Sequence, residues 1–268
     1  MNAAFALSAL LAFAPSQGAS TFGISNMRLT YGELGSARPD NKYTPFDFVY
    51  VSFDIDGLKA AADGRVIYSM GLEVIDKAGK AVMSEPPRKS EMLMHLGGAK
   101  LPAYIFVIPG TEMQPGPYTC KITIIDDATK ATKVAEQKFE IVPLTFGLVR
   151  LYVTKDENML YACGSTGVVG QTVFINFFMV GFGRNVAKKP DAAVEFRILD
   201  ADGQPTTTKP TLVTVPPEFP ENESAVRFQF MIPLNREGSF TVEMKAADKI
   251  SGKTATMTLP VKVYPAAK

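Results

Sequence analysis

Tryptophan is absent from this sequence of 268 residues, histidine occurs once and cysteine twice. A Ser–His–Asp catalytic set would have to use His95, which lies in the apolar stretch Met92–Leu96, and no Gly-x-Ser-x-Gly motif is present. Cys120 and Cys163 are too few and too far apart in the sequence for a Cys/His zinc site. No phosphate-binding or dinucleotide-binding glycine motif occurs either. The sequence therefore predicts a protein that is not an enzyme and that carries no metal and no cofactor.

An excess of charge of one sign is also missing. The formal net charge is +1, and basic and acidic residues nearly balance in each half of the chain. Nucleic acids and anionic membranes attract strongly basic surfaces, so no nucleic acid is expected as a partner. Apolar runs are short as well, because none reaches the roughly 20 residues that a membrane-spanning helix needs. No integral membrane span is therefore expected.

The first twenty residues differ from the rest of the chain. Residues 3–14 are apolar and uncharged, and small residues follow between positions 16 and 20. This pattern predicts a secretory signal peptide at residues 1–20, cleaved after Gly18 or Ser20, although no lysine or arginine precedes the apolar run. The alternative is a buried first strand or helix. A cleaved signal places the protein outside the cytoplasm, in the periplasm, at the cell surface or in the medium.

The remainder of the chain contains one pattern twice. Residues 49–58 match residues 173–182, and residues 72–80 match residues 196–204, both at an offset of 124. Further matches pair Arg28 with Arg150, Ile108 with Ile232 and, after a two-residue indel, Tyr118 with Phe240. A duplication of this extent predicts two domains of one type, at residues 21–143 and 144–268.

Alternation of apolar and polar residues predicts strands in each copy. Val49, Val51 and Phe53 alternate with Tyr50 and Ser52, which is the period of two that a half-buried strand requires. Turn sequences rich in aspartate and glycine separate such stretches, and no long stretch has a helical period. We therefore expect an all-β protein of two tandem β-sandwich domains with about seven strands each.

A resemblance to a known class of domain sharpens this expectation. The segment Pro115–Ile122, followed by Asp126 and a closing strand that ends at Pro143, resembles the last two strands of bacterial immunoglobulin-like domains. Tyr118 stands two residues before Cys120, as in the tyrosine corner of immunoglobulin domains. The chain after its leader is similar to exported bacterial proteins built from such domains. The resemblance implies tandem immunoglobulin-like sandwiches without the antibody-type disulfide, and it implies no particular ligand.

Cysteines and carboxylates were considered as further candidate groups. Cys120 and Cys163 fall at non-equivalent positions of the repeat, so free thiols, the first buried and the second in a loop, are expected; a disulfide between them is the alternative. Calcium needs six to eight oxygen ligands. Asp54 with Asp56 is one candidate pair, and a second lies in the turn at residues 200–203, but neither pair recurs in the other copy. The sequence therefore predicts no calcium site.

One strand differs in kind between the two copies. If Ile175 and Phe177 point inward, the outward side chains of the second copy include Phe174, Phe178 and Val180, where the first copy has Tyr50, Asp54 and Asp56. An apolar outer face must be covered or used for binding. The other domain, the linker or a loop covers it in one interpretation. In the other, Phe174, Phe178 and Val180 form an interface with a partner.

These observations predict a non-catalytic, exported binding or structural protein of the cell envelope, with a protein or a cell-envelope component as partner. One alternative is a pair of carbohydrate-binding modules, for which Tyr31, Tyr43 and Tyr50 are the candidate stacking residues, although the absence of tryptophan weakens it. The other alternative is an extracytoplasmic hydrolase with carboxylates in a cleft.

Overall fold

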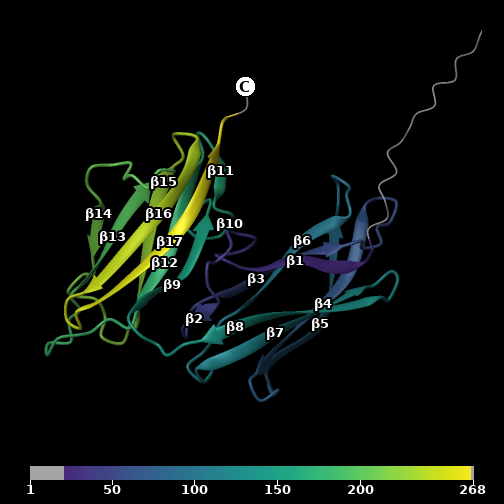
Figure 1. Cartoon of the computed structure of the whole chain (residues 1–268), viewed down its shortest axis with the longest axis horizontal. Coiled ribbons are helices and arrows are strands. Elements are labelled where there is room, and N and C mark those ends of the chain that lie inside the picture. Colours follow the sequence, from purple (N-terminus) through teal and green to yellow (C-terminus); the bar gives the residue numbers. More distant parts are fainter. Residues whose placement is uncertain (1–20, 267–268) are drawn as a thin grey trace, which may run out of the picture.

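The computed structural model describes residues 21–266, which form seventeen β-strands arranged as two domains (Figure 1). Within these residues there is no helix, and hence none that could cross a membrane. The signal peptide predicted at residues 1–20 lies outside the described residues. The expectation of an all-β chain is confirmed.

Domain 1 is a sandwich of two sheets. Its strands are β1 (Gly23–Thr30), β2 (Lys42–Tyr43), β3 (Val49–Asp56), β4 (Arg65–Asp76), β5 (Ala81–Leu93), β6 (Lys100–Val107), β7 (Gly116–Asp126) and β8 (Thr132–Ile141). One sheet has the order β1-β3-β6 and the other the order β2-β8-β7-β4-β5. All neighbouring strands are antiparallel except β2, which runs parallel to β8.

Domain 2 repeats this arrangement. Its strands are β9 (Gly147–Thr154), β10 (Ala162–Cys163), β11 (Thr166–Val168), β12 (Thr172–Val180), β13 (Ala192–Leu199), β14 (Thr211–Thr214), β15 (Ala225–Pro233), β16 (Gly238–Asp248) and β17 (Lys253–Tyr264). One sheet has the order β10-β9-β12-β15 and the other the order β11-β17-β16-β13-β14. Here β11 runs parallel to β17, as β2 does to β8. Apart from the short β10 at the edge of its sheet in domain 2, the two copies therefore share strand order and strand direction.

The core of each domain comes from the inward side of alternating strands. In β3, the inward residues Val49, Val51 and Phe53 are fully buried, as the alternation predicts. Tyr50 and Ser52 on the outward side are buried too, so a second layer of side chains covers this face. In β16 and β17 the alternation is regular, and the inward residues join the core of domain 2.

The first strands align differently from the sequence match. Arg28 lies opposite Ser52 and Tyr152 lies opposite Asn176, so Arg28 corresponds to Tyr152 at the offset of 124. The predicted pairing of Arg28 with Arg150 is wrong. Both first strands contain an irregularity in strand pairing, which a comparison of the two sequences does not reveal. Arg150, with φ of 55°, takes the place of Asn26, with φ of 52°. Such steps are β-bulges, which bend a strand at a fixed position.

A second correction concerns the strand before the tyrosine-corner loop. Val107 pairs with Val49 and Ile232 pairs with Val173, so Ile232 corresponds to Val107 and not to Ile108. Burial agrees, since Val107 and Ile232 are buried and Ile108 is 41% exposed. Counted to the glycine that opens the next strand, Gly116 or Gly238, the loop is therefore three residues shorter in domain 2.

Two buried polar arrangements recur in both copies. The Thr30 hydroxyl lies 2.8 Å from the Ser52 hydroxyl, and the Thr154 hydroxyl accepts a hydrogen bond from the Asn176 amide at 3.0 Å. Each threonine also donates to the carbonyl two residues later. Because a buried polar group without a partner is costly, such shared networks support a common ancestral fold.

The aspartates at the ends of β7 and β16 are equally conserved between the copies. Asp126 accepts a hydrogen bond from the Lys59 backbone amide at 3.3 Å, and Asp248 accepts one from the Gly183 amide at 2.7 Å. Each also accepts from the backbone two residues later and from a hydroxyl three residues later. These carboxylates anchor the same loop in both domains, which explains why the repeat retains them.

Candidate functional site

A buried ion pair fixes the boundary between the domains. The Arg38 guanidinium lies 3.0 Å from the Asp47 carboxylate, and their side chains are 8% and 4% exposed. The other oxygen of Asp47 accepts a hydrogen bond from the backbone amide of Arg150 in domain 2 at 2.7 Å. The Arg150 side chain in turn donates to the Phe46 carbonyl. One carboxylate therefore joins a loop of domain 1 to the bulge in the first strand of domain 2.

The junction also covers part of the apolar face predicted from the sequence. The Arg150 guanidinium lies between the rings of Phe48, at 5.0 Å, and Phe178, at 5.4 Å. Val180 is buried beside the linker and Phe178 is half-buried. Phe174, also half-buried, lies farther along β12 opposite the exposed Met231. Arg150, from domain 2 itself, covers part of Phe178. The interface with a partner at Phe174, Phe178 and Val180 stays a prediction.

The tyrosines considered for sugar stacking are buried. Tyr31 packs with the core of domain 2, Tyr43 lies under the Arg38 guanidinium at 4.2 Å, and Tyr50 is enclosed by neighbouring rings. A stacking residue must present a free ring face to a sugar. The prediction that these three tyrosines bind carbohydrate is therefore wrong.

The other charged or metal-binding candidate residues take part in structural contacts or are exposed. Lys100 lies 2.7 Å from Asp56 and 3.9 Å from Asp54, and its hydrogen bond lowers the pKa of Asp56. The carboxylate of Asp200 accepts hydrogen bonds from two backbone amides of its own turn. Within residues 21–266 no three histidine, cysteine or acidic side chains gather as metal ligands. His95 is exposed in the turn after β5.

The two cysteines are free thiols in different domains. Cys120 is fully buried in the core of domain 1, and burial raises the pKa of its thiol to about 12. Cys163 is half-buried in the short strand β10 and not in a loop as the sequence suggested; burial raises its pKa as well. Neither thiol has the lowered pKa that nucleophilic cysteines require.

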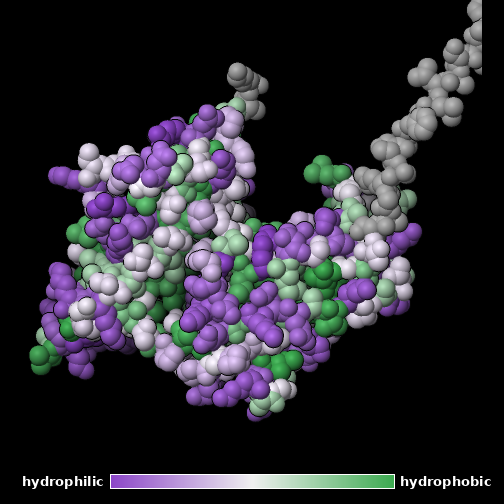
Figure 2. Space-filling model, viewed as in Figure 1, coloured by the Kyte–Doolittle hydropathy of each residue, from purple (hydrophilic) through white to green (hydrophobic). Residues whose placement is uncertain are grey.

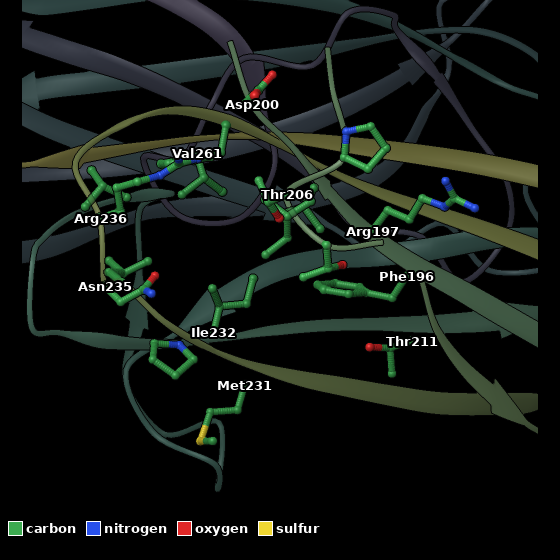
Figure 3. Close-up of a pocket in the computed structure, with 18 residues that line it drawn as sticks. Phe196, Arg197, Asp200, Thr206, Thr211, Met231, Ile232, Asn235, Arg236 and Val261 are labelled. Atoms are coloured by element: carbon green, nitrogen blue, oxygen red, sulfur yellow. The ribbon is translucent and has the colours of Figure 1, made fainter. Parts of the chain in front are cut away.

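A cavity of about 700 Å³ lies at one end of domain 2 and is the strongest candidate for a binding site (Figure 3). Side chains from β13, β15 and β17 and from the loop after β15 surround it, as Phe196, Ile232, Val261 and Asn235 show. Buried residues of both sheets, among them Ile232 and Val261, line it together with polar residues such as Thr206 and Asn235. A volume of this size is in the range of pockets that hold small molecules.

The equivalent end of domain 1 is filled by large side chains. Tyr118 stacks on Phe139 with ring centroids 5.8 Å apart, and Tyr43 meets Phe139 edge-on at 6.1 Å. Met113 is buried against the same group. The Tyr118 hydroxyl donates to the Gln114 carbonyl at 2.8 Å, which holds the loop over the end of the sandwich. The depression outside this plug, about 550 Å³, has no lining residue from β6 or β8.

Four substitutions between the copies open this end in domain 2. Strand pairing and loop counting show the correspondence: Tyr43 to Gly167, Met113 to Asn235, Tyr118 to Phe240 and Phe139 to Val261. Three of the replacements are smaller or more polar, and the fourth loses the hydroxyl that fastens the loop. Leu234, from the shortened loop, fills the space above Gly167 but leaves the rest open.

A difference in the neighbouring strand widens the opening. In domain 1, β5 pairs with β4 from Arg65 to Ile75, whereas in domain 2 the short β14 pairs with only four residues of β13. Residues 205–210 therefore leave the sheet after one bridge at Pro205, and Thr206 and Thr207 line the cavity. The cavity lining thus combines hydroxyl groups with apolar residues such as Ile232.

The charged residues at the rim differ in their ion pairs and hydrogen bonds. Arg197 pairs with Glu195 at 2.7 Å, and the Asp200 carboxylate is held by backbone amides of its own turn. Arg236 has no ion pair with any residue from 21 to 266, and its guanidinium stands 5.1 Å from the centroid of the Phe240 ring. The lining contains no histidine, cysteine or lysine. Among the described residues, the rim thus carries one cation, Arg236, and one anion, Asp200, that are in no ion pair.

Sequence reasoning pointed to β12 and did not find this cavity. The repeat did contain a sign of the cavity: Phe240 replaces Tyr118, and a two-residue indel precedes this position in the alignment of the two copies. The length of the loop after β15 depends on how β15 pairs with β12, which the sequence does not give. The absence of the aromatic packing seen in domain 1 could therefore not be predicted.

No protein-family model matches the chain, and no curated protein matches it in sequence. Among solved structures, the C-terminal domain of the Streptococcus pyogenes antigen I/II-family protein AspA has a TM-score of 0.30 and 11% identity, covering 90% of this chain and 99% of that one. The C-terminal domain of the Streptococcus agalactiae AgI/II polypeptide BspA has the same TM-score, 0.30, and identity, 11%, covering 89% and 99%. Red sea bream transglutaminase has a TM-score of 0.27 and 9% identity over 92% of this chain and 31% of that one. A likeness of this degree carries no inference about function.

Proposed function

We propose that this chain is a non-catalytic binding protein of the cell envelope, in which domain 2 holds the ligand and domain 1 is a closed support. One observation carries the proposal: the same end of the same sandwich is plugged in domain 1 and is a cavity of about 700 Å³ in domain 2. Export rests on the signal-like character of residues 1–20.

Both domains are inferred to be immunoglobulin-like. The two sheets of domain 1, β1-β3-β6 and β2-β8-β7-β4-β5, and the hydrogen bond from the Tyr118 hydroxyl to the carbonyl four residues upstream support this inference. Sandwiches of this type bind ligands at their ends and edges without catalytic residues. The cavity lies at such an end.

The rest of the surface supports a localised site. In the face shown in Figure 2, polar residues cover most of both domains, and hydrophobic residues occur in small groups. Large exposed apolar patches mark protein interfaces, and this face has none of that kind. The junction ion pair of Asp47 keeps the domains in one relative orientation, so that the cavity is presented at a fixed position.

The test is binding of the uncharged fluorophore N-phenyl-1-naphthylamine to the whole chain. Val261→Phe restores the residue of domain 1 and places an aromatic ring in the cavity. We expect the wild-type chain to bind one molecule of the fluorophore and Val261→Phe to weaken binding about tenfold or more, since the ring occupies the site. Val134→Phe adds the same ring to the exposed outer side of β8 and serves as the matched control.

Thermal melting shows whether each variant is folded. Undiminished binding by a folded Val261→Phe variant, or no binding by the wild-type chain, would contradict the proposal.

A further inference from the structure

Strand β15 is the last strand of its sheet in domain 2 and pairs only with β12. The Leu234 amide donates to the Gln171 carbonyl at 2.8 Å, which fixes the alternation of hydrogen bonds along this antiparallel pair. The amides and carbonyls of Arg227, Gln229 and Met231 consequently point away from β12. No other strand within residues 21–266 pairs with this side of β15. The strand therefore presents a row of unpaired backbone groups, which can accept another extended strand.

The equivalent strand of domain 1 has an interrupted row. Strand β6 is also the last strand of its sheet, and the Gly57 amide donates to the Ala99 carbonyl at 2.8 Å, so the even-numbered residues of β6 face outward. In the register of the two strands, Pro102 of β6 corresponds to Arg227 of β15. A proline has no amide hydrogen, and prolines at such positions prevent edge strands from pairing. The edge is thus protected in domain 1 and continuous in domain 2.

The side chains of β15 are suited to pairing with a second copy of the same strand. The segment Val226–Ile232 has the sequence VRFQFMI, which is nearly symmetric about Gln229. A two-fold axis at Gln229 places apolar side chains opposite apolar side chains in an antiparallel pair of copies. Phe230, half-buried in a single copy, then lies opposite Phe228 of the second copy. Aromatic pairs of this kind stabilise antiparallel strands.

Charge is compatible with the same pairing. Arg227 is the only charged residue of β15, and its guanidinium contacts the Met159 sulfur at 4.0 Å. Under the two-fold axis, Arg227 lies opposite Met231 of the second copy, whose side chain is 62% exposed in a single copy. The two arginines are then four positions apart along the strands, or about 14 Å. This separation exceeds the screening length of about 8 Å at physiological ionic strength, so their repulsion is weak.

We infer that two copies of this chain associate through β15, antiparallel and related by a two-fold axis at Gln229, so that their four-stranded sheets form one continuous sheet. Backbone hydrogen bonds supply the register, and burial of Met231 and Phe230 adds apolar contact. Two-fold pairs are the commonest homo-oligomers, because the same surface serves both copies. The inference does not depend on the ligand of the cavity.

Sedimentation equilibrium of the whole chain, at up to about 300 µM because an interface one strand wide is small, measures the association. The wild-type chain is expected to form a dimer and nothing larger. Met231→Lys places a cation opposite Arg227 of the second copy, twice in each dimer, so it should weaken association about tenfold or more. Met231→Glu places an anion at the same position and should retain or strengthen the dimer, with any gain removed by added salt.

Two further variants locate the interface. Arg227→Pro gives β15 the residue of domain 1 and removes one outward amide, so it should abolish the dimer. Val134→Lys adds the charge of Met231→Lys to the exposed outer side of β8 and should leave the dimer intact. Thermal melting shows whether each variant is folded, and the pair of Met231 variants decides the question if Arg227→Pro is not.

A wild-type chain that stays monomeric over this range would overturn the inference, as would a series of species larger than the dimer. Equal effects of Met231→Lys and Met231→Glu would contradict the two-fold register, and a dimer retained by a folded Arg227→Pro variant would contradict the role of β15. A monomeric chain that still binds N-phenyl-1-naphthylamine leaves the proposed function standing.

Discussion

The two domains differ least where their backbones are fixed and most at one end. Strand order, the buried Thr30 and Thr154 networks and the anchoring carboxylates Asp126 and Asp248 are the same in both. At the end beside the tyrosine-corner loop, domain 1 packs aromatic rings and domain 2 encloses a cavity. The difference shows that one fold can carry either packed rings or a cavity at the same end, through four side chains and a shorter loop.

The two ends also differ in where they lie relative to the junction ion pair. In domain 1 this end lies at the junction, where Arg38 stands over Tyr43 and pairs with Asp47. In domain 2 the junction contacts lie near Val180, at one end of β12, and the cavity lies near Ile232, which pairs at the other end. Domain 1 also contacts domain 2 beside the cavity, where the Ser36 hydroxyl lies next to that of Ser165 and donates to the Pro260 carbonyl at 3.4 Å.

The largest expected loss of stability comes from a substitution at the junction between the domains. Asp47→Ala removes the partner of the buried Arg38 and the acceptor for the Arg150 amide, so it should lower the free energy of unfolding by about 3–5 kcal/mol. Gln171 is the equivalent residue of domain 2 and contacts only its own loop. Gln171→Ala should cost about 1 kcal/mol or less. Urea unfolding measures both, and equal losses would refute a special role for Asp47.

Opening the plugged end should be the next largest effect. Phe139→Val gives domain 1 the residue of domain 2 and removes the ring on which Tyr118 stacks. The loss of buried contacts and the cavity left behind should lower the free energy of unfolding by about 2–4 kcal/mol. Urea unfolding is again the measurement. A loss below about 1 kcal/mol would show that the rings at this end do not form a tight plug.

Alkaline pH should affect the two cores differently. Cys120 corresponds to Val242 in domain 2, and its thiol has a pKa raised by burial to about 12, against 9.0 for the exposed group. The unfolded chain loses this proton first, so the stability that the neutral thiol supports is complete below pH 9 and is lost as the pH rises toward 12. The slope is at most about 1.4 kcal/mol per pH unit.

Cys120→Val isolates this contribution. Unfolding measured at pH 8, 9 and 10 should show a smaller decline for Cys120→Val than for the wild-type chain. Identical pH dependence in the two proteins would mean that Cys120 is not buried as the structure shows.

The smallest expected effect is a gain. Val261→Phe adds a ring that can stack on Phe240 within open volume, so it should raise the free energy of unfolding by about 0.5–2 kcal/mol. Overpacking of a filled core instead costs about 1–3 kcal/mol. A destabilised Val261→Phe variant would therefore show that this end of domain 2 has no usable space.

The sequence was sufficient for the large features of the molecule. Alternation in Val49–Phe53 predicted strands, and the matches at an offset of 124 predicted two domains of one type, because the hydrophobic period and the repeat can be read directly from the sequence. Tyr118, which the sequence singled out, donates its hydroxyl hydrogen bond to the Gln114 carbonyl four residues upstream.

The register of strand pairing, and the side chains that cover an apolar face, could not be predicted in the same way. The bulge at Arg150 and the true partner of Ile232 depend on which residues pair across strands, which matching letters do not determine. From the sequence, Phe178 and Val180 form an open apolar face. The linker beside Val180 and the Arg150 side chain over Phe178 could not be placed there, because both are distant from β12 in the sequence. The cavity required both the register and the missing rings to be known together.

The most direct test of the central claim is methyl NMR of the whole chain during titration with 1-anilinonaphthalene-8-sulfonate. The cavity model predicts shifts of the Ile232, Leu234 and Val261 methyl signals, with those of Met113 and Ile141 at the plugged end of domain 1 unchanged. Shifts confined to domain 1 or to Val180 at the junction, with the Ile232 and Val261 signals unmoved, would contradict it.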